Sequence, residues 1–353
     1  MTHNLAYSEG LLQQLTEAHG TSGFESEVTR IIEDELSAIG KLSYDKLGGI
    51  TCELGPEDAP KILICSHQDE VGFRIQSITP DGFLQFMPVG GWWGHTLLAQ
   101  KVTLKNRFEK KFSGIICSQP VHFLPASQKN AVIPIESMYI DIGALSKKQV
   151  EEEFQLRVGD PIVPATSFEK LPNHRYTAKA FDNRVGVACM IEVGRQLKEI
   201  EHQLTHRIVL GATVQEEVGL RGAKVMANRI DPDFAIILEG PPADDTPGFN
   251  PALSQGRMGM GCQIRLQDSS AILDPTLSNQ IIDTAEAHNI PLQITMRRSG
   301  GTDAGAIHQS GNGVPCAALG VPSRYIHTHH SMIDIKDYFA MIELTTQAVL
   351  SFS

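Results

Sequence analysis

Polar side chains that could hold a metal ion follow the apolar run at residues 62–65. His67 and Asp69 stand two residues apart just beyond that run. Since residues two apart in an extended strand point to the same side, the Asp69 carboxylate could accept a hydrogen bond from the His67 ring nitrogen that faces away from a metal. His67 alone would favour a structural histidine, whereas the pair favours a metal ligand that Asp69 orients.

Two adjacent carboxylates, Glu216 and Glu217, follow a second apolar run at residues 208–213. A solvated acidic pair on a loop is the ordinary interpretation of such a sequence. Adjacent carboxylates repel each other, however, unless a cation neutralises one of them. The two carboxylates are therefore expected to have different roles: one binds metal and the other transfers protons.

Three further candidates lie near the ends of predicted elements. Asp182 stands immediately before a helical segment, where capping of the helix is an alternative role. Glu239 ends a third apolar run, and His327 begins a cluster that also contains His329 and His330. Each of these residues alone is a weak indication of a metal site.

The strength of the prediction comes from the common position of the candidates. In doubly wound sheets, ligands bind beyond the carboxyl ends of the strands, so that distant segments converge on one edge. Nitrogen and oxygen ligands without cysteine suit zinc, cobalt or manganese, and a bridging carboxylate can hold two such ions roughly 3.5 Å apart. We therefore expect a hydrolase with two divalent metal ions.

The elements that must position these side chains are predicted from apolar spacing. Residues 11–39 have helical spacing on both sides of a turn at residues 20–23, where Ser22 is expected to cap the second helix. Beyond residue 168, helices alternate with apolar strands as in an α/β domain. The helices are expected at residues 185–200, 222–227 and 278–288, and the strands at residues 207–213, 235–238 and 315–318.

The middle of the chain has a different residue pattern, in which short strand-like stretches are interrupted by Gly, Pro and Asp. The sequence therefore predicts an α/β fold with a doubly wound mixed sheet and helices on both faces, formed by residues 1–71 and 169–353. A small all-β, barrel-like domain at residues 72–168 is inserted into it. Its strands are expected at residues 73–78, 102–104, 113–117 and 161–165.

Composition and charge exclude several classes of partner and location. The formal net charge is -11 and no basic block is present, which argues against binding to nucleic acid. No segment approaches the roughly 20 apolar residues of a membrane-spanning helix, and the first residues lack the apolar core of a secretory signal. Six scattered cysteines without a CxxC pair indicate buried thiols in a reducing compartment. We expect a cytoplasmic protein.

The motifs that contain these candidates resemble those of the cytoplasmic metalloaminopeptidases of the M42 type, which include glutamyl aminopeptidases and the tetrahedral TET peptidases. The resemblance runs nearly end to end, and the order and spacing of the motifs are more specific than any one motif. The motifs are Gly20-Thr-Ser-Gly-Phe-Glu25, His67-Gln-Asp-Glu-Val-Gly72, Ala180-Phe-Asp-Asn-Arg184, Gln215-Glu-Glu-Val-Gly219, Gly300-Gly-Thr-Asp-Ala304 and Pro322-Ser-Arg-Tyr-Ile-His327.

The resemblance implies the zinc-exopeptidase fold and a co-catalytic pair of metal ions, with zinc or cobalt expected and manganese as an alternative. It also implies that Glu216 is the general base and acid, and that Glu70 is not a ligand. Asp182 is the ligand that bridges the ions. The remaining ligands are His67 and Glu239 at one ion, and Glu217 and His327 at the other.

The same resemblance implies peptide substrates and a homo-oligomer, in which the inserted domain drives dimerisation and dimers assemble into a hollow dodecamer. Two departures from the family pattern concern the site. Glu239 stands where an aspartate is common, and the residues after His327 differ from the Ser-Pro-x-Glu of many members. His329 or His330 could therefore add a ligand or contact the substrate.

Two alternatives to an aminopeptidase remain open. One is another metal-dependent hydrolase on the same scaffold, either a deacylase or an endoglucanase-like enzyme, although glycoside hydrolysis ordinarily uses two carboxylates without metal. The other is an inactive assembly protein, which the presence of Glu216 disfavours. Trp92 and Trp93 are expected to form a core pair rather than an interface anchor, and the role of His95 is open.

Overall fold

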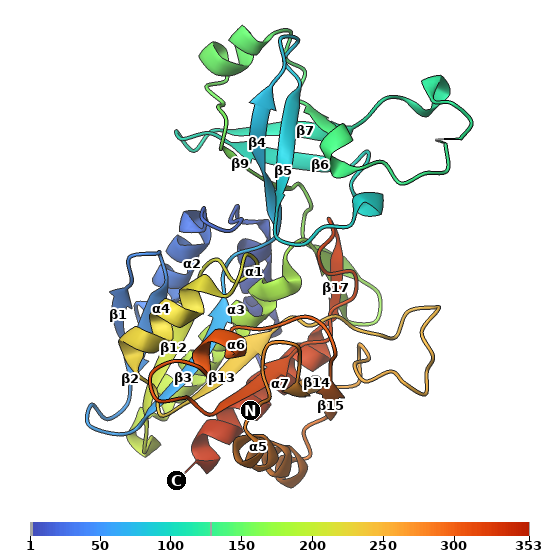
Figure 1. Ribbon diagram of the computed structural model, residues 1–353. Helices are drawn as coiled ribbons and strands as arrows, with labels where there is room; N and C mark the ends of the chain where they lie inside the picture. Colours follow the sequence, from blue (N-terminus) through green and yellow to red (C-terminus); the bar gives the residue numbers. More distant parts are fainter. Residues whose placement is uncertain (1–2, 128, 353) are drawn as a thin grey trace.

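The computed structural model describes residues 3–127 and 129–352 of the chain. These residues form an α/β body and a β barrel that stands on one side of it (Figure 1). Sheet strands of the body come both before and after the barrel in the sequence, so the barrel is an insertion into the body. The mixed α/β architecture with a closed barrel confirms the predicted fold class.

A mixed eight-stranded sheet forms the centre of the body within the described residues. Its order is β1 (Lys41–Tyr44), β2 (Ile50–Leu54), β12 (Arg207–Thr213), β3 (Lys61–His67), β13 (Phe234–Glu239), β16 (Cys316–Gly320), β14 (Cys262–Gln267) and β15 (Leu292–Met296). The four strands from β12 to β16 run parallel, whereas β2 and β14 pair antiparallel on either side of them.

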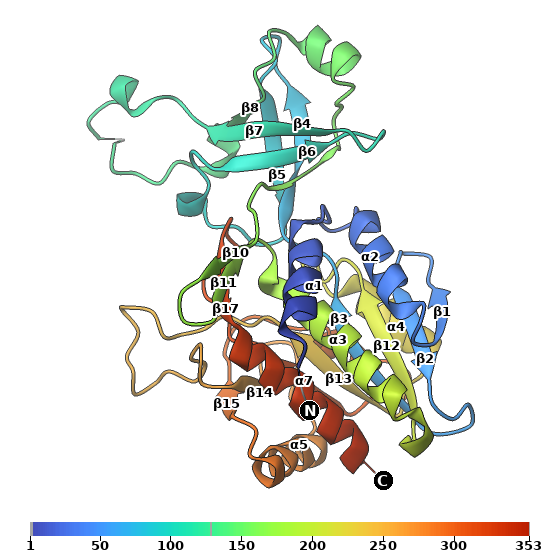
Figure 2. The ribbon, with the colours of Figure 1, turned by 180° about the vertical axis from the view of Figure 1, so that it is seen from behind.

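Helices cover both faces of the sheet because its central strands are apolar on both sides. In β3, Ile62 and Ile64 belong to one core cluster, and Leu63 and Cys65 belong to another, as the two-residue period of a strand requires. The first face carries α1 (Leu5–Glu17), α2 (Ser26–Leu36), α3 (Phe181–Glu199), α5 (Pro275–His288) and α7 (Ile335–Ser351) (Figure 2). The second face carries α4 (Arg221–Ile230) and α6 (Ala304–Ile307).

Six antiparallel strands close the barrel. Their order is β4 (Gly72–Ile78), β5 (Leu84–Val89), β8 (Tyr139–Asp141), β7 (Lys111–Cys117), β6 (Lys101–Lys105) and β9 (Pro161–Pro164). Buried side chains such as Phe73, Leu84, Val102 and Ile140 fill the interior. The chain re-enters the body through a small sheet of β10 (Glu169–Leu171), β11 (Arg175–Ala178) and β17 (Ser331–Asp334).

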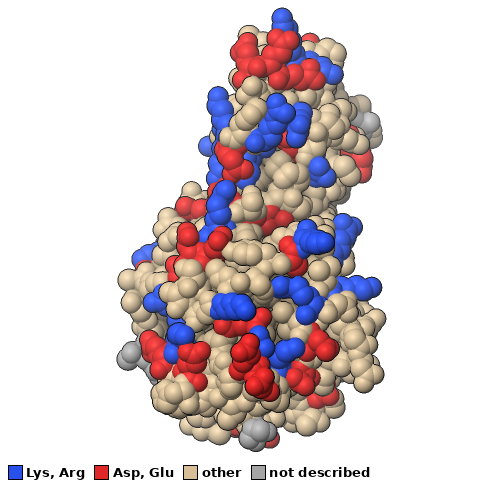
Figure 3. Space-filling model, turned by 90° about the vertical axis from the view of Figure 1, so that its left-hand side faces the viewer, with Lys and Arg blue, Asp and Glu red and all other residues tan. Residues whose placement is uncertain are grey.

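The surface carries charges of both signs. Figure 3 shows Lys and Arg side chains among Asp and Glu side chains over both the barrel and the body. Ion pairs join the two parts, with Lys111 Nζ of the barrel 2.6 Å from Glu27 Oε1 of the body. No helix among residues 3–127 and 129–352 is long and apolar enough to cross a membrane.

Two local predictions are wrong. Ser22 does not cap α2, because Glu25 occupies the N-cap position and the Ser22 hydroxyl donates to Asp69 Oδ2 at 2.6 Å. Trp92 stacks on Phe73 of the barrel core with ring centroids 4.6 Å apart, but Trp93 is 65% exposed. Only the first tryptophan of the pair is therefore anchored in the core.

Candidate active site

Parallel strands bring several of the predicted residues to one edge of the sheet. His67 is the last residue of β3, Glu239 is the last residue of β13, and Glu216 and Glu217 follow shortly after β12. Since β3 lies between β12 and β13 and all three run in the same direction, their carboxyl ends lie side by side. The structure thus brings together the segments that were expected to converge.

Asp182 and His327 reach the same edge from two other segments. Asp182 lies in the first turn of α3 with a non-helical ψ of 100°, and it does not cap the helix. Instead, Asn183 Oδ1 accepts the N–H of Gly186 at 3.1 Å, which leaves the Asp182 carboxylate available to the site. His327 lies in the loop between β16 and β17.

Left-handed backbone conformations occur at one candidate and within two residues of two others. The φ angles of Ala180, Gln215 and His327 are 56°, 57° and 57°. Side chains other than glycine disfavour this region, and residues held in it are frequent at functional sites. Gln215 directly precedes Glu216, so the direction of a candidate catalytic side chain depends on this conformation.

The five predicted metal ligands form two groups that share Asp182. Asp182 Oδ1 lies 3.3 Å from His67 Nε2, and Asp182 Oδ2 lies 3.3 Å from His327 Nε2. Glu239 Oε2 is 3.7 Å from His67 Nε2, and Glu217 Oε2 is 3.3 Å from His327 Nε2. Within each group, one potential ligand atom from every residue lies within 4.8 Å of the others.

Glu216 lies next to both groups. Its Oε2 is 3.8 Å from His67 Nε2, and it forms a third set of potential ligands with His67 and Glu217. The position is close enough for a proton acceptor that serves the whole cluster.

Burial of the four carboxylates strongly perturbs their protonation. Burial raises the pKa of Glu216 and of Glu239 well above the usual value for a glutamate. Burial together with the charge of Asp182 raises the pKa of Glu217 to about 8. Burial would also raise the pKa of Asp182, but hydrogen bonds with the two histidines hold it below its ordinary value.

The two histidines respond in the opposite direction. Burial alone would lower the pKa of His67, but the surrounding carboxylates, led by Glu216, outweigh burial and raise it. For His327, a hydrogen bond with Asp182 and the charge of Glu217 outweigh burial and raise the pKa to about 9. The cluster therefore retains protons, as expected where negative groups are crowded without enough positive charge.

The chemistry of the donor set fits divalent metal ions. Glu217 Oε1 and Glu239 Oε1 are buried and have no hydrogen-bond partner within the described part of the chain. Such oxygens are unfavourable unless a cation or a donor satisfies them. Imidazole nitrogens and carboxylate oxygens without cysteine suit zinc, cobalt or manganese.

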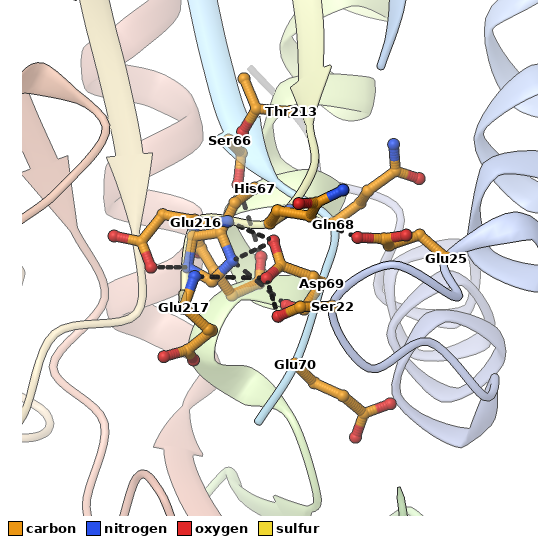
Figure 4. Close-up of polar contacts among 12 residues, drawn as sticks. Ser22, Glu25, Ser66, His67, Gln68, Asp69, Glu70, Thr213, Glu216 and Glu217 are labelled. Atoms are coloured by element: carbon orange, nitrogen blue, oxygen red, sulfur yellow. Dashed lines mark hydrogen bonds and ion pairs between the residues drawn. The ribbon is translucent and has the colours of Figure 1, made fainter. Parts of the chain in front are cut away.

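Asp69 contacts His67 mainly through its main chain. His67 Nδ1 is 3.1 Å from the Asp69 carbonyl oxygen and 3.5 Å from carboxylate Oδ1. The carboxylate accepts the main-chain N–H groups of Glu216 at 3.0 Å and Glu217 at 3.2 Å, and the hydroxyl of Ser22 at 2.6 Å (Figure 4). The expected orienting contact is therefore accompanied by a second role, which is to hold the loop that carries the two glutamates.

Glu70 belongs to a separate buried ion cluster. Its Oε1 lies 2.6 Å from Lys179 Nζ and 3.0 Å from Arg184 Nη2, and all three side chains are buried. Arg184 Nε also donates to the carbonyl oxygen of Gln68 at 2.8 Å, which ties the segment after β3 to α3. Among the residues that the structure describes, Glu70 belongs to no set of potential ligands.

A pocket of about 770 Å³ opens onto the two groups. Three arginines, Arg265, Arg297 and Arg298, line it, together with Asp244, whose Oδ2 is paired with Arg297 Nη1 at 2.6 Å. Its apolar walls are supplied by Leu220, Pro241, Pro242, Phe249, Leu253, Met296 and Ile326. The size and mixed lining suit a small ligand such as the end of a peptide.

Some functional candidates were missed from the sequence, and others lie apart from the site. Asp303 is fully buried, accepts a hydrogen bond from the Thr213 hydroxyl, and has its pKa raised by burial to about 6. It stands in one of the motifs of the resemblance, which was the available signal. His329 is buried against Trp92 with ring centroids 5.5 Å apart, and His330 is exposed; neither belongs to a ligand set found among the described residues.

A family model and curated relatives match this chain over most of its length. Residues 48–344 match the family model of the M42 glutamyl aminopeptidases. The glutamyl aminopeptidase of Lactococcus lactis subsp. cremoris (strain MG1363) is 37% identical over 331 residues, covering 93% of this chain and 91% of the relative.

Solved structures are similar over nearly the whole chain. The TET aminopeptidase from the marine sediment archaeon Thaumarchaeota archaeon SCGC AB-539-E09 has a TM-score of 0.95 and 38% identity, covering 98% of this chain and 97% of its own. The TET1 peptidase of Pyrococcus horikoshii, which can assemble into a tetrahedron or a large octahedral shell, has a TM-score of 0.85 and 30% identity. That match covers 96% of this chain and 98% of the other.

Proposed function

The chain belongs to the M42 glutamyl aminopeptidase family, and from this we propose that it removes the N-terminal residue of peptides with two divalent metal ions and Glu216 as general base. The observation that carries the proposal is the pair of ligand groups that share Asp182 at one edge of the sheet. The pocket that opens onto both groups supports it further.

The residues that would hold the ions are those of the two groups, with Asp182 as the shared ligand. His67 and Glu239 would complete one set, and Glu217 and His327 the other. When bound, such ions supply a water of lowered pKa and polarise the scissile carbonyl group. Zinc or cobalt fits the donors best, with manganese as an alternative.

Glu216 would carry the proton in both halves of the reaction. Its carboxylate takes a proton from the attacking water, and it gives that proton to the nitrogen of the leaving amine as the C–N bond breaks. Asp69 would assist by fixing the main chain of Glu216 and the orientation of His67.

The inserted domain at residues 72–168 would provide a dimer contact, and the dimers would assemble into a larger shell, since the TET1 peptidase of Pyrococcus horikoshii can form a tetrahedron or a large octahedral shell. Apolar side chains on the barrel part support this proposal, since Trp93, Phe123 and Leu145 are 65%, 73% and 85% exposed. Light scattering on a size-exclusion column tests it, and a monomer at micromolar concentration would contradict it.

Metal removal tests the proposed function directly. A panel of aminoacyl-p-nitroanilides is assayed before and after dialysis against a chelator, and again with added zinc, cobalt or manganese. Activity should disappear with the chelator and return with one of the ions, and His67→Ala should bind less metal. Activity that survives the chelator would contradict a metal-dependent reaction, and turnover confined to N-acyl amino acids or glucans would favour one of the alternative hydrolases.

A further inference from the structure

The turn between α1 and α2, residues 20–25, has no part in the mechanism above, yet it contacts both loops of the site. Ser22 donates its hydroxyl to Asp69 Oδ2 at 2.6 Å, and the Gly20 carbonyl accepts the N–H of Glu70 at 3.0 Å. Glu25 reaches the other loop, where its Oε1 accepts the N–H of Gln215 at 3.3 Å. The turn thus contacts both the segment after β3 and the segment after β12, and Figure 4 shows Ser22 next to Asp69.

Two buried carboxylates hold three successive N–H groups of the loop after β12. Glu25 accepts the N–H of Gln215, and Asp69 accepts the N–H groups of Glu216 and Glu217 at 3.0 Å and 3.2 Å. Glu25 is 6% exposed and Asp69 is 0% exposed. Together, these hydrogen bonds from consecutive main-chain N–H groups to two carboxyl side chains fix the backbone of the loop.

Gln215, which directly precedes Glu216 in this loop, has a backbone conformation that needs support. Its φ of 57° lies in the left-handed region, which a side chain disfavours. A rotation of Gln215 toward negative φ would change the direction in which Glu216 leaves the main chain. Glu25 opposes that rotation through the N–H of Gln215, and the N–H of Gly23 fixes Glu25 Oε1 in turn at 2.7 Å.

We propose that Glu25 is a positioning residue for Glu216: by holding Gln215 in the left-handed conformation, it aims the Glu216 carboxylate at the two ligand groups. The inference rests on the proposed role of Glu216 as general base. Glu25 itself is outside the pocket and outside the ligand sets among the described residues. Its loss should therefore lower kcat and leave KM and metal content unchanged.

The first experiment compares Glu25→Ala, Glu25→Gln and the control Glu27→Ala in the metal-loaded enzyme. Glu27 is close by in sequence and partly buried, but its carboxylate pairs with Lys111 and not with the loop after β12. We expect kcat of Glu25→Ala to fall by roughly 10- to 100-fold, because small misplacements of a catalytic group have effects of this size. Glu25→Gln keeps an acceptor oxygen and should recover most of kcat, and Glu27→Ala should match the unaltered enzyme.

The second experiment adds Gln215→Gly. Glycine adopts positive φ without hindrance, so it removes the need for Glu25 to hold this residue. In the Glu25→Ala background, Gln215→Gly should raise kcat by at least about threefold, whereas alone it should change kcat by less than about twofold. A merely structural role for Glu25 predicts a lower melting temperature in Glu25→Ala and no such rescue.

Three results would overturn the proposal: kcat of Glu25→Ala within twofold of the unaltered enzyme, a loss of metal or a rise in KM that accounts for the defect, or the absence of rescue by Gln215→Gly. If Glu25→Ala does not fold, Glu25→Met has similar volume without a carboxylate, and the same criteria apply to it. Glu216→Gln separates the two ideas. If Glu216→Gln stays active, the proposed function fails, whereas an inactive Glu216→Gln with a fully active Glu25→Ala refutes only the positioning role.

Discussion

Glu216 and Glu217 are adjacent, of the same type and both partly buried, yet opposite roles are proposed for them. Replacing each carboxylate by an amide of the same size therefore isolates the role. Glu216→Gln removes a proton acceptor next to both ligand groups while leaving all five proposed ligands in place. General bases contribute roughly 10²- to 10⁴-fold to the rate, so we expect kcat to fall about 10³-fold, which corresponds to about 4 kcal/mol in the activation free energy. Metal content should stay the same.

Glu217→Gln should behave differently because its carboxylate oxygen faces His327 at 3.3 Å within a proposed ligand set. An amide is a weaker metal ligand than a carboxylate, and the substitution leaves only Asp182 and His327 as strong donors in that set. We expect metal affinity at that set to weaken by at least about tenfold. Excess metal should restore part of the activity of this variant, whereas it should not restore Glu216→Gln.

The assay is steady-state hydrolysis of aminoacyl-p-nitroanilides over a range of metal concentrations, with metal content measured by mass spectrometry after gel filtration. Circular dichroism checks that both variants are folded. The reasoning is refuted if Glu216→Gln loses metal and is rescued by excess metal while Glu217→Gln is not. Near-normal kcat in Glu216→Gln at full metal content would also refute it.

Three other predictions concern the pocket, acid stability and the buried ion cluster. Arg265 and Arg297 of the pocket are paired with Asp268 and Asp244, so Arg298 is the pocket arginine that should favour substrates with an acidic N-terminal residue. Arg298→Ser should lower the glutamyl-to-leucyl ratio of kcat/KM several-fold; an unchanged ratio would exclude a role for Arg298 in this preference. Burial, together with nearby lysines, lowers the pKa of His19 to about 2. In the unfolded state His19 has the ordinary histidine pKa of about 6.5, so below that pH the unfolded state binds a proton that the folded state does not bind. The free energy of unfolding therefore falls as pH falls. We expect His19 to lower the free energy of unfolding by about 2 kcal/mol between pH 7 and pH 5. Urea unfolding at the two pH values should show this loss in the unaltered protein, and the loss should be absent in His19→Gln. Glu70→Gln leaves Lys179 and Arg184 buried without an anion and should destabilise the fold by about 3 kcal/mol, measured as a lower melting temperature; a variant as stable as the original would contradict this.

The parts of the fold that the sequence predicts are those in which one physical rule dominates. β3 and β13 are buried on both faces, so they appear as continuous apolar runs that end where polar residues begin. α7 is missing from the predicted elements because its buried residues include Asp337, Thr345 and Thr346 and are not confined to one apolar face. β1 was also missed, since its four residues are exposed or half-buried and the strand is held mainly by pairing with β2.

The candidate site shows a similar division. His67 and Glu239 are weak candidates one by one, but their shared position at strand ends predicts that they lie together, because parallel strands end at one edge of the sheet. The contacts of Ser22 and Glu25 depend on how a turn packs against two loops that are distant in sequence, and no local pattern specifies that packing. For Ser22 the local rule for helix capping even favours a different partner.

The shared position of Asp182 depends on two glycines as much as on ligand chemistry. A Cβ at Gly240 would lie 2.7 Å from the Phe181 carbonyl oxygen, and a Cβ at Gly186 would lie 2.5 Å from the Leu238 carbonyl oxygen. The start of α3 therefore packs on the end of β13 backbone against backbone, with no room for a side chain at either point. Because Asp182 has a short side chain, this approach is what allows its two oxygens to reach both histidines at 3.3 Å. Alanine at either glycine is therefore expected to push the start of α3 away from the end of β13 and to move Asp182 relative to both ligand groups.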